Sequence, residues 1–226
     1  MNTIQKYNSP VFGWNIKTHL SITELALKDN PLIAKNIKRY IARCSELPDL
    51  MRAELADMSS RHFYDALHLD PSFGTVNDAK NNAMSAFLRH DTFAKRAAKK
   101  GDINTYYREV GYALHYLQDG GTPPHTEHGN YLHKLFRLPM HILFERGKKV
   151  GTTNRLDTLL KNYKSEEIPF SNLKSLFHNT ALFTLQPENL VNYLNIYKWA
   201  GIQQRCFDRS VNASKAYLNR ALHYIG

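Results

Sequence analysis

The chain has 226 residues, of which 42% are hydrophobic and 22% are charged, a composition typical of a globular protein with its own core. Its formal net charge of +10 at pH 7 favours phosphate-rich partners, either nucleic acid or an anionic membrane surface, or else serves solubility alone. No apolar run approaches the roughly 20 residues that a membrane-spanning helix needs. We find no internal repeat and no low-complexity linker, so we expect a single domain over residues 1–226.

Helical periodicity dominates the sequence, and no stretch alternates in the way of strands joined by hairpin turns. Apolar residues along one side predict a first helix over residues 16–29, and Pro31 opens a second helix that ends at Cys44. Further helices are predicted over residues 79–100, 103–119, 130–147, 171–185 and 188–224. The predicted fold class is therefore all-α, a multi-helix bundle.

The richest stretch of side-chain chemistry covers residues 111–145. Its metal-ligand types are His115, Asp119, His125, His141 and Glu145. The first two and the last two of these are each four residues apart, so each pair shares one face of a helix and can direct two ligands at one ion. Imidazole and carboxylate ligands without a thiolate are typical of catalytic rather than structural zinc sites.

Three residues outside this stretch supply further candidate ligands. His19 lies in the first turns of the first predicted helix, Asp49 lies in a predicted loop, and His62 begins the tetrad HFYD. The eight nitrogen and oxygen donors are too many for one zinc ion. They suit two or three ions if Asp119, which has two carboxylate oxygens, bridges a pair of them.

Other side chains compete for these positions. Asp57 is an alternative to Asp49, although it lies close to His62 in the sequence. His128 and His133 lie near the later ligands and are alternatives there. The remaining histidines fit no ligand position, and we interpret them as structural or surface residues: His68, His90, His178 and His223.

The order and spacing of these pieces resemble the zinc-dependent phospholipases C of bacteria and their relatives, the single-strand-specific zinc nucleases of fungi. The matching pieces are Trp14 with Thr18 and His19, residues 62–65 (HFYD), residues 114–125 (LHYLQD to PPH) and residues 141–145 (HILFE). Each piece alone is a weak signal. All of them in order, with H-x3-D-x5-H intact, make a strong one, and the resemblance covers residues 14–145.

This resemblance implies an all-α phosphodiester hydrolase that binds two to three zinc ions. It implies one zinc held by Asp49, His62, His115 and Asp119. It implies a second zinc held by His125, His141 and Glu145. We also expect Asp49 to accept a proton from the nucleophile while it acts as a ligand.

A third zinc is implied on His19 and Asp119, completed in the family by the amino and carbonyl groups of an N-terminal tryptophan. Trp14 occupies that place, but residues 1–13 precede it as an N-terminal extension, so its nitrogen is an amide and a poor ligand. Either the extension is removed, or the site uses the Trp14 carbonyl, water or another side chain. We expect the second outcome, because Phe12 and Gly13 do not form a small-x-small cleavage signal.

The family is usually secreted, but this chain shows no apolar leader segment. We therefore expect a cytoplasmic protein, or one exported by a route without a cleaved signal. The oligomeric state and the pairing of Cys44 with Cys206 stay open.

Three functions are compatible with the sequence. A phospholipase C that cleaves glycerophospholipids to diacylglycerol and a phosphorylated headgroup is favoured by HFYD and by Thr18 with His19. A single-strand-specific nuclease, with nucleic acid as partner, is favoured by the net charge and by the short interval between Trp14 and His19. A non-catalytic metal-binding or membrane-binding module is disfavoured by the complete ligand set.

Overall fold

The computed structural model describes residues 16–31, 33–50, 64, 82–126, 155–186, 188–189 and 199–225. Within these residues the regular structure is helical throughout and no strand occurs, so the predicted all-α class is confirmed. The helices are α1 (Ile16–Leu27), α2 (Lys35–Cys44), α3 (Leu47–Leu50), α5 (Ala83–Lys99), α6 (Ile103–Asp119), α7 (Pro123–Thr126), α9 (Arg155–Lys161), α10 (Leu173–Thr184), α11 (Trp199–Ala221) and the 3-10 turn η4 (Leu222–Tyr224). Among these helices, none has the length and apolarity to cross a membrane.

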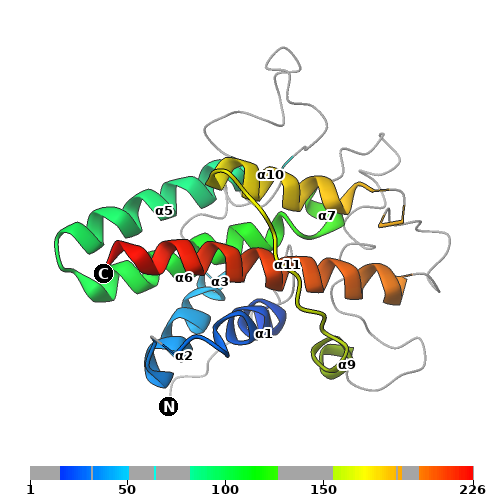
Figure 1. The fold of residues 1–226 in the computed structure, drawn as a ribbon, viewed down its shortest axis with the longest axis horizontal. Helices are drawn as coiled ribbons and strands as arrows, with labels where there is room; N and C mark the ends of the chain where they lie inside the picture. Colours follow the sequence, from blue (N-terminus) through cyan, green and yellow to red (C-terminus); the bar gives the residue numbers. More distant parts are fainter. Residues whose placement is uncertain are drawn as a thin grey trace, which may run out of the picture.

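The helix α6 is the centre of the bundle (Figure 1). It packs along α5 and also contacts α1, α2 and α11, while α10 lies against α5 and α11. The last two turns of α6, residues 113–119, are buried on every side. The helix that carries the central sequence motif is therefore surrounded by protein, and its polar side chains must find partners inside the bundle.

The turn between α5 and α6 is fixed by consecutive stop and start signals. Gly101 has a φ of 70°, in the left-handed region that favours glycine. Its N–H donates to the Ala98 carbonyl, and the N–H of Asp102 donates to the Ala97 carbonyl, both at 3.0 Å, which is a Schellman motif. The Asp102 side chain then accepts from the N–H of Thr105 at 3.1 Å and caps α6. These signals explain why the predicted bounds of α6 match those observed.

Other helices begin later than predicted because an extended residue precedes them. Asn82 and Asn172 are extended and cap α5 and α10, each accepting from the N–H of the serine three residues on. Ala34 is extended as well, so α2 begins at Lys35 and not at Pro31.

Three short helices, α3, α7 and α9, were not predicted as separate elements. The predicted helix over residues 188–224 is α11 from Trp199 on, with residues 188–189 in a turn. The predicted helix over residues 130–147 lies outside the described residues.

Cys44 and Cys206 are both buried, and neither forms a disulfide.

Gly111 brings α2 and α6 into close approach. A Cβ at this position would lie 2.8 Å from the carbonyl oxygen of Ile41 and would also collide with the Cβ of Cys44. Glycine therefore lets the end of α2 rest directly on α6. This contact places Ser45, the residue after α2, beside His115 one turn further along α6.

Candidate metal centre

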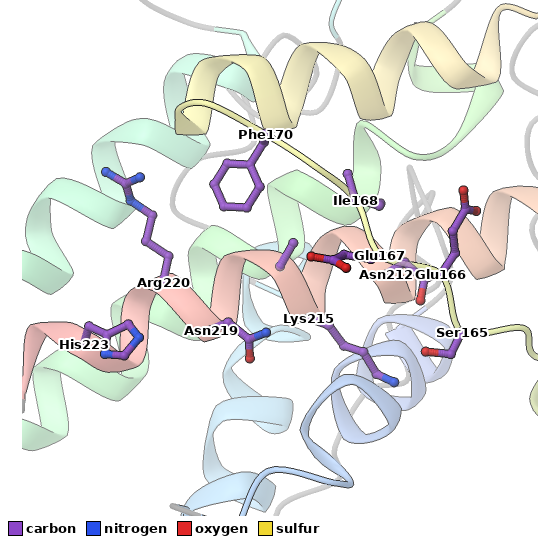
Figure 2. Close-up of a pocket in the computed structure, with 11 residues that line it drawn as sticks. Ser165, Glu166, Glu167, Ile168, Phe170, Asn212, Lys215, Asn219, Arg220 and His223 are labelled. Atoms are coloured by element: carbon purple, nitrogen blue, oxygen red, sulfur yellow. The ribbon is translucent and has the colours of Figure 1, made fainter.

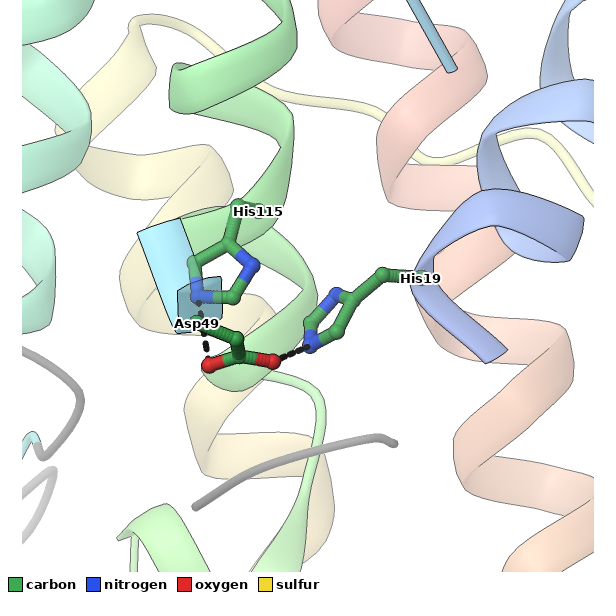
Figure 3. A group of neighbouring side chains, drawn as sticks. All are labelled: His19, Asp49 and His115. Atoms are coloured by element: carbon green, nitrogen blue, oxygen red, sulfur yellow. Dashed lines mark ion pairs between the residues drawn. The ribbon is translucent and has the colours of Figure 1, made fainter. Parts of the chain in front are cut away.

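Four side chains from three helices converge at the end of α6. His115 and Asp119 come from α6, His19 from α1 and Asp49 from α3, and Figure 3 shows both imidazoles turned toward the Asp49 carboxylate. Nε2 of His115 lies 3.3 Å from Oδ2 of Asp119 and 3.6 Å from Oδ1 of Asp49. Nε2 of His19 lies 3.5 Å from Oδ1 of Asp119 and 3.9 Å from Oδ2 of Asp49. Each carboxylate thus presents one oxygen to each imidazole.

The separations and the burial of these groups suit a metal ion. The ligand atoms of His19, Asp49 and His115 all lie within 4.8 Å of one another. With bonds of about 2.0–2.1 Å in a tetrahedral zinc site, neighbouring donors lie about 3.4 Å apart, close to the distances observed. The His19, His115 and Asp119 side chains are 0% exposed and that of Asp49 is 3% exposed, so the cluster is shielded from bulk water.

The polar chemistry of the cluster also calls for a cation. Nε2 of His19 is buried and makes no hydrogen bond within the described part of the chain. Two carboxylates buried together destabilise the fold unless positive charge lies among them. Divalent cations among the imidazole nitrogens and the carboxylate oxygens would satisfy both requirements, so the residues fit metal binding.

The pKa values of the two imidazoles are shifted in opposite directions. Burial is the largest influence on His115 and lowers its pKa, and the charges of Asp119 and Asp49 do not offset it. Burial acts in the same direction on His19, but the adjacent Asp119 carboxylate and the charge of Asp49 raise its pKa above the ordinary value. Positive charge is therefore favoured on the His19 side of the cluster.

The second nitrogen of each imidazole is held by a hydrogen bond. Nδ1 of His115 donates to the carbonyl oxygen of Ser45 at 2.9 Å. Nδ1 of His19 lies 2.8 Å from Oε1 of Gln118. Metal-binding histidines ordinarily make such a bond with the ring nitrogen that faces away from the ion. Both rings thus direct Nε2 into the cluster.

The structure describes five of the nine predicted ligands. His19, Asp49, His115 and Asp119 come together, and Asp49 lies in the short helix α3 and not in the predicted loop. His125 lies on α7 and is buried. The other four predicted ligands, and the alternatives to them, lie outside the described residues: Trp14, His62, His141 and Glu145, with Asp57, His128 and His133.

Tyr64, the third residue of the HFYD tetrad, is hydrogen-bonded to α7. The N–H of Tyr64 donates to the carbonyl oxygen of His125 at 2.8 Å, and the Tyr64 hydroxyl lies 3.0 Å from Nδ1 of His178. His90, another histidine with no assigned ligand position, lies 2.7 Å from a carboxylate oxygen of Glu109. His90 and His178 thus have polar partners other than the four converging side chains.

Sequence reasoning missed Ser45 and Gln118. Gln118 precedes Asp119 directly and is a polar residue in a fully buried part of α6. That position was a usable signal, because a buried amide requires hydrogen-bond partners. Ser45 gave no such signal, since it contacts His115 through a backbone carbonyl that every residue has.

A surface pocket lies apart from the cluster, between residues 165–170 and α11 (Figure 2). Its lining includes Lys215 and Arg220 from α11 and Glu166 and Glu167 from the other segment, two basic and two acidic side chains. No candidate metal ligand lines this pocket.

Comparison with known proteins supports the fold. No family model and no curated protein matches the chain. Among solved structures, the chain is similar to the alpha toxin from Clostridium absonum, with a TM-score of 0.62 over 96% of this chain and 16% sequence identity. The chain spans 65% of the length of the toxin chain. At this identity the likeness shows the fold, and the protein therefore has the all-α fold of the alpha toxin.

Proposed function

We propose that the protein is a zinc-dependent phosphodiester hydrolase of the phospholipase C type, which cleaves glycerophospholipids to diacylglycerol and a phosphorylated headgroup. The observation that carries this proposal is the convergence of two buried imidazoles and two buried carboxylates. Their residues are those that the resemblance to zinc-dependent phospholipases C assigns to metal ligands. The alpha-toxin fold supports the proposal at the level of architecture.

The proposed ligand sets follow the resemblance. The first ion would be held by Asp49, His62, His115 and Asp119, and the second by His125, His141 and Glu145. A third would be held by His19 and Asp119, with the Trp14 carbonyl or water. Bound zinc would supply a hydroxide near neutral pH and would neutralise charge that develops on the phosphate.

The two carboxylates take different roles in this proposal. Asp119 turns Oδ1 toward His19 and Oδ2 toward His115, so one residue can serve two ions. Asp49 retains slight exposure, at 3%, where Asp119 has none. Oδ2 of Asp49 also has the longest separation in the cluster, 3.9 Å from His19. We propose that Asp49 accepts a proton from the attacking water while it acts as a ligand.

An assay of the full chain loaded with zinc on phosphatidylcholine vesicles tests the proposal. We expect diacylglycerol release that a chelator abolishes and added zinc restores. Asp119→Asn should remove the activity. Asp91→Asn is the matched control, because Asp91 is also buried but its carboxylate binds Lys95 at 2.7 Å and Tyr224 at 3.0 Å. Equal activity in the two variants, or diacylglycerol release that does not depend on zinc, would contradict the proposal.

A nuclease is the second candidate function, and the net charge of +10 favours it. Single-stranded DNA is therefore the second substrate in the same assay, at the same zinc concentration. Zinc-dependent DNA cleavage without diacylglycerol release would replace the phospholipase assignment. It would leave the phosphodiesterase chemistry of the same residues in place.

A further inference from the structure

Gln118 is a fully buried amide in the last turn of α6. Its Oε1 lies 2.8 Å from Nδ1 of His19, and its Nε2 lies 2.9 Å from Oγ1 of Thr23 and 3.3 Å from Oγ of Ser214. His19 and Thr23 are four residues apart on α1 and share the face that meets this amide. We infer that Gln118 is a positioning residue of the metal centre, which holds His19 as the Nδ1–H tautomer and leaves the Nε2 lone pair for an ion.

The orientation of the amide decides whether His19 can bind a metal. The oxygen and nitrogen ends of a glutamine side chain have the same shape, so hydrogen-bond directions must distinguish them. If the oxygen faces His19, Nδ1 must carry the proton. If the nitrogen faced His19, Nδ1 would accept, and the single proton of the neutral ring would move to Nε2 and block coordination.

The directions follow from the carbonyl oxygen of Ala42, which can only accept. The Ser45 hydroxyl lies 2.7 Å from this oxygen and therefore donates its proton there. Oγ1 of Thr23 lies 3.0 Å from Oγ of Ser45, which has no second proton, so Thr23 is the donor in that bond. Thr23 then has no proton for Gln118, so the amide nitrogen faces Thr23 and the amide oxygen faces His19.

Ser45 fixes the second imidazole as well. Its backbone carbonyl accepts from Nδ1 of His115 at 2.9 Å, so this ring is also the Nδ1–H tautomer. One residue thus orients His115 directly and His19 through the side chains of Thr23 and Gln118. The participating side chains are buried, where a reversed bond would leave two acceptors facing each other. Both Nε2 lone pairs are therefore directed into the cluster by the fold itself.

The first test measures metal binding and uses Co²⁺, which occupies zinc sites and absorbs visible light. In Gln118→Leu the acceptor for Nδ1 is lost, and we expect Co²⁺ affinity to fall about 10–100-fold with a changed visible spectrum. Gln118→Glu keeps the acceptor for Nδ1 but loses the donor to Thr23, so we expect it to bind Co²⁺ more tightly than Gln118→Leu and less tightly than the original protein. The inference rests on the proposed function only in taking His19 as a metal ligand, and hydrolysis is not measured.

Asn212→Leu is the matched control for loss of a buried amide. The Asn212 side chain accepts from the Tyr163 hydroxyl at 2.6 Å and donates to the Lys164 carbonyl at 3.1 Å. We expect this variant to bind Co²⁺ as the original protein does. If Gln118→Leu matches Asn212→Leu in affinity and spectrum, the positioning role is overturned.

The second test needs no substitution, so it does not depend on how well a variant folds. In the zinc-loaded protein, a ¹H–¹⁵N correlation spectrum of the imidazoles should show a proton on Nδ1 of His19 and of His115. A proton on Nε2 of His19 overturns the inference even if the protein hydrolyses phospholipid. A proton on Nδ1 in a protein that hydrolyses no phosphodiester supports the inference and contradicts the proposed function alone.

Discussion

Gln118 and Asp119 hold the same imidazole from its two nitrogens. Oε1 of Gln118 lies 2.8 Å from Nδ1 of His19, and Oδ1 of Asp119 lies 3.5 Å from Nε2 of that ring. Consecutive residues on a helix point about 100° apart, so the ring from α1 fits into the angle between the two side chains. A single turn of α6 thus both orients His19 and supplies the carboxylate that faces it.

Asp119 should be more important for zinc content than a ligand that serves one ion. Its two oxygens face different imidazoles, so Asp119→Asn is expected to remove charge from two proposed sites. Elemental analysis should find at least two zinc ions per chain in the original protein and a larger loss in Asp119→Asn than in Glu145→Gln. Asp91→Asn should keep the full zinc content. Small and equal losses in Asp119→Asn and Glu145→Gln would mean that Asp119 only pairs with His115 inside the bundle and serves no ion.

The parts of the fold that the sequence predicts well are those with local signals. The bounds of α6 follow from the Asp102 cap and the glycines after Asp119, and the four-residue spacing correctly places His115 and Asp119 on one face. Asp49 was expected in a loop, because α3 has only four residues and so shows no periodicity. The start of α2 was wrong for a related reason, since Pro31 is also favoured in turns.

The hydrogen bonds that connect Ser45, Thr23, Gln118 and His19 are tertiary contacts, and no local sequence pattern predicts them. Thr23, Ser45 and Ser214 are small polar residues on separate stretches of the chain, and each has many ordinary roles. Only the packing of α1, α6 and α11 shows that the hydroxyls of Thr23 and Ser214 meet one amide and that Ser45 accepts from Thr23. The sequence therefore predicts the four converging side chains but not the residues that orient them.

Gly111→Ala is expected to destabilise the contact between α2 and α6. The added methyl group would meet the Ile41 carbonyl at 2.8 Å and the side chain of Cys44, and such overpacking costs about 1–3 kcal/mol. Gly201→Ala is the matched control in α11, where the nearest atom is an Arg205 guanidinium nitrogen at 3.4 Å. That change should be neutral or stabilise by up to about 1 kcal/mol. Urea unfolding of both variants measures the difference, and equal midpoints would contradict the close approach.

Glu109 should stabilise the protein in a pH-dependent way. Burial raises the pKa of this carboxyl, but hydrogen bonds and charge interactions with His90 and Arg108 outweigh burial and lower the pKa below its ordinary value of 4.5. A lowered folded-state pKa means that the stabilisation is complete above about pH 4.5 and is lost as the pH falls through the folded pKa.

The variant Glu109→Gln tests this dependence. It should reduce the free energy of unfolding at pH 7 by about 1–3 kcal/mol, because the charge-assisted bonds to His90 and Arg108 are weakened. The gap from the original protein should narrow below pH 4.5. Urea unfolding in chelator at several pH values measures it, with the exposed Glu167→Gln as control. A gap that is constant with pH would contradict the assignment.

Zinc removal should lower the thermal stability of the protein through the same buried centre. Each of the two imidazole Nε2 atoms lies 3.3–3.9 Å from an oxygen of both carboxylates, the four side chains have almost no exposure, and unfolding would hydrate all of them. An ion that binds the folded chain at 100 times its dissociation constant adds about 2.7 kcal/mol to the free energy of unfolding. For a chain of this length that corresponds to a rise in Tm of about 5–10 °C.

Calorimetry with zinc and with chelator measures the rise. His115→Ala should reduce the rise, because the change removes a donor from the cluster. His90→Ala should retain it, because His90 pairs with Glu109. A Tm that does not respond to zinc would show that the four side chains form a buried ion-pair network without a metal.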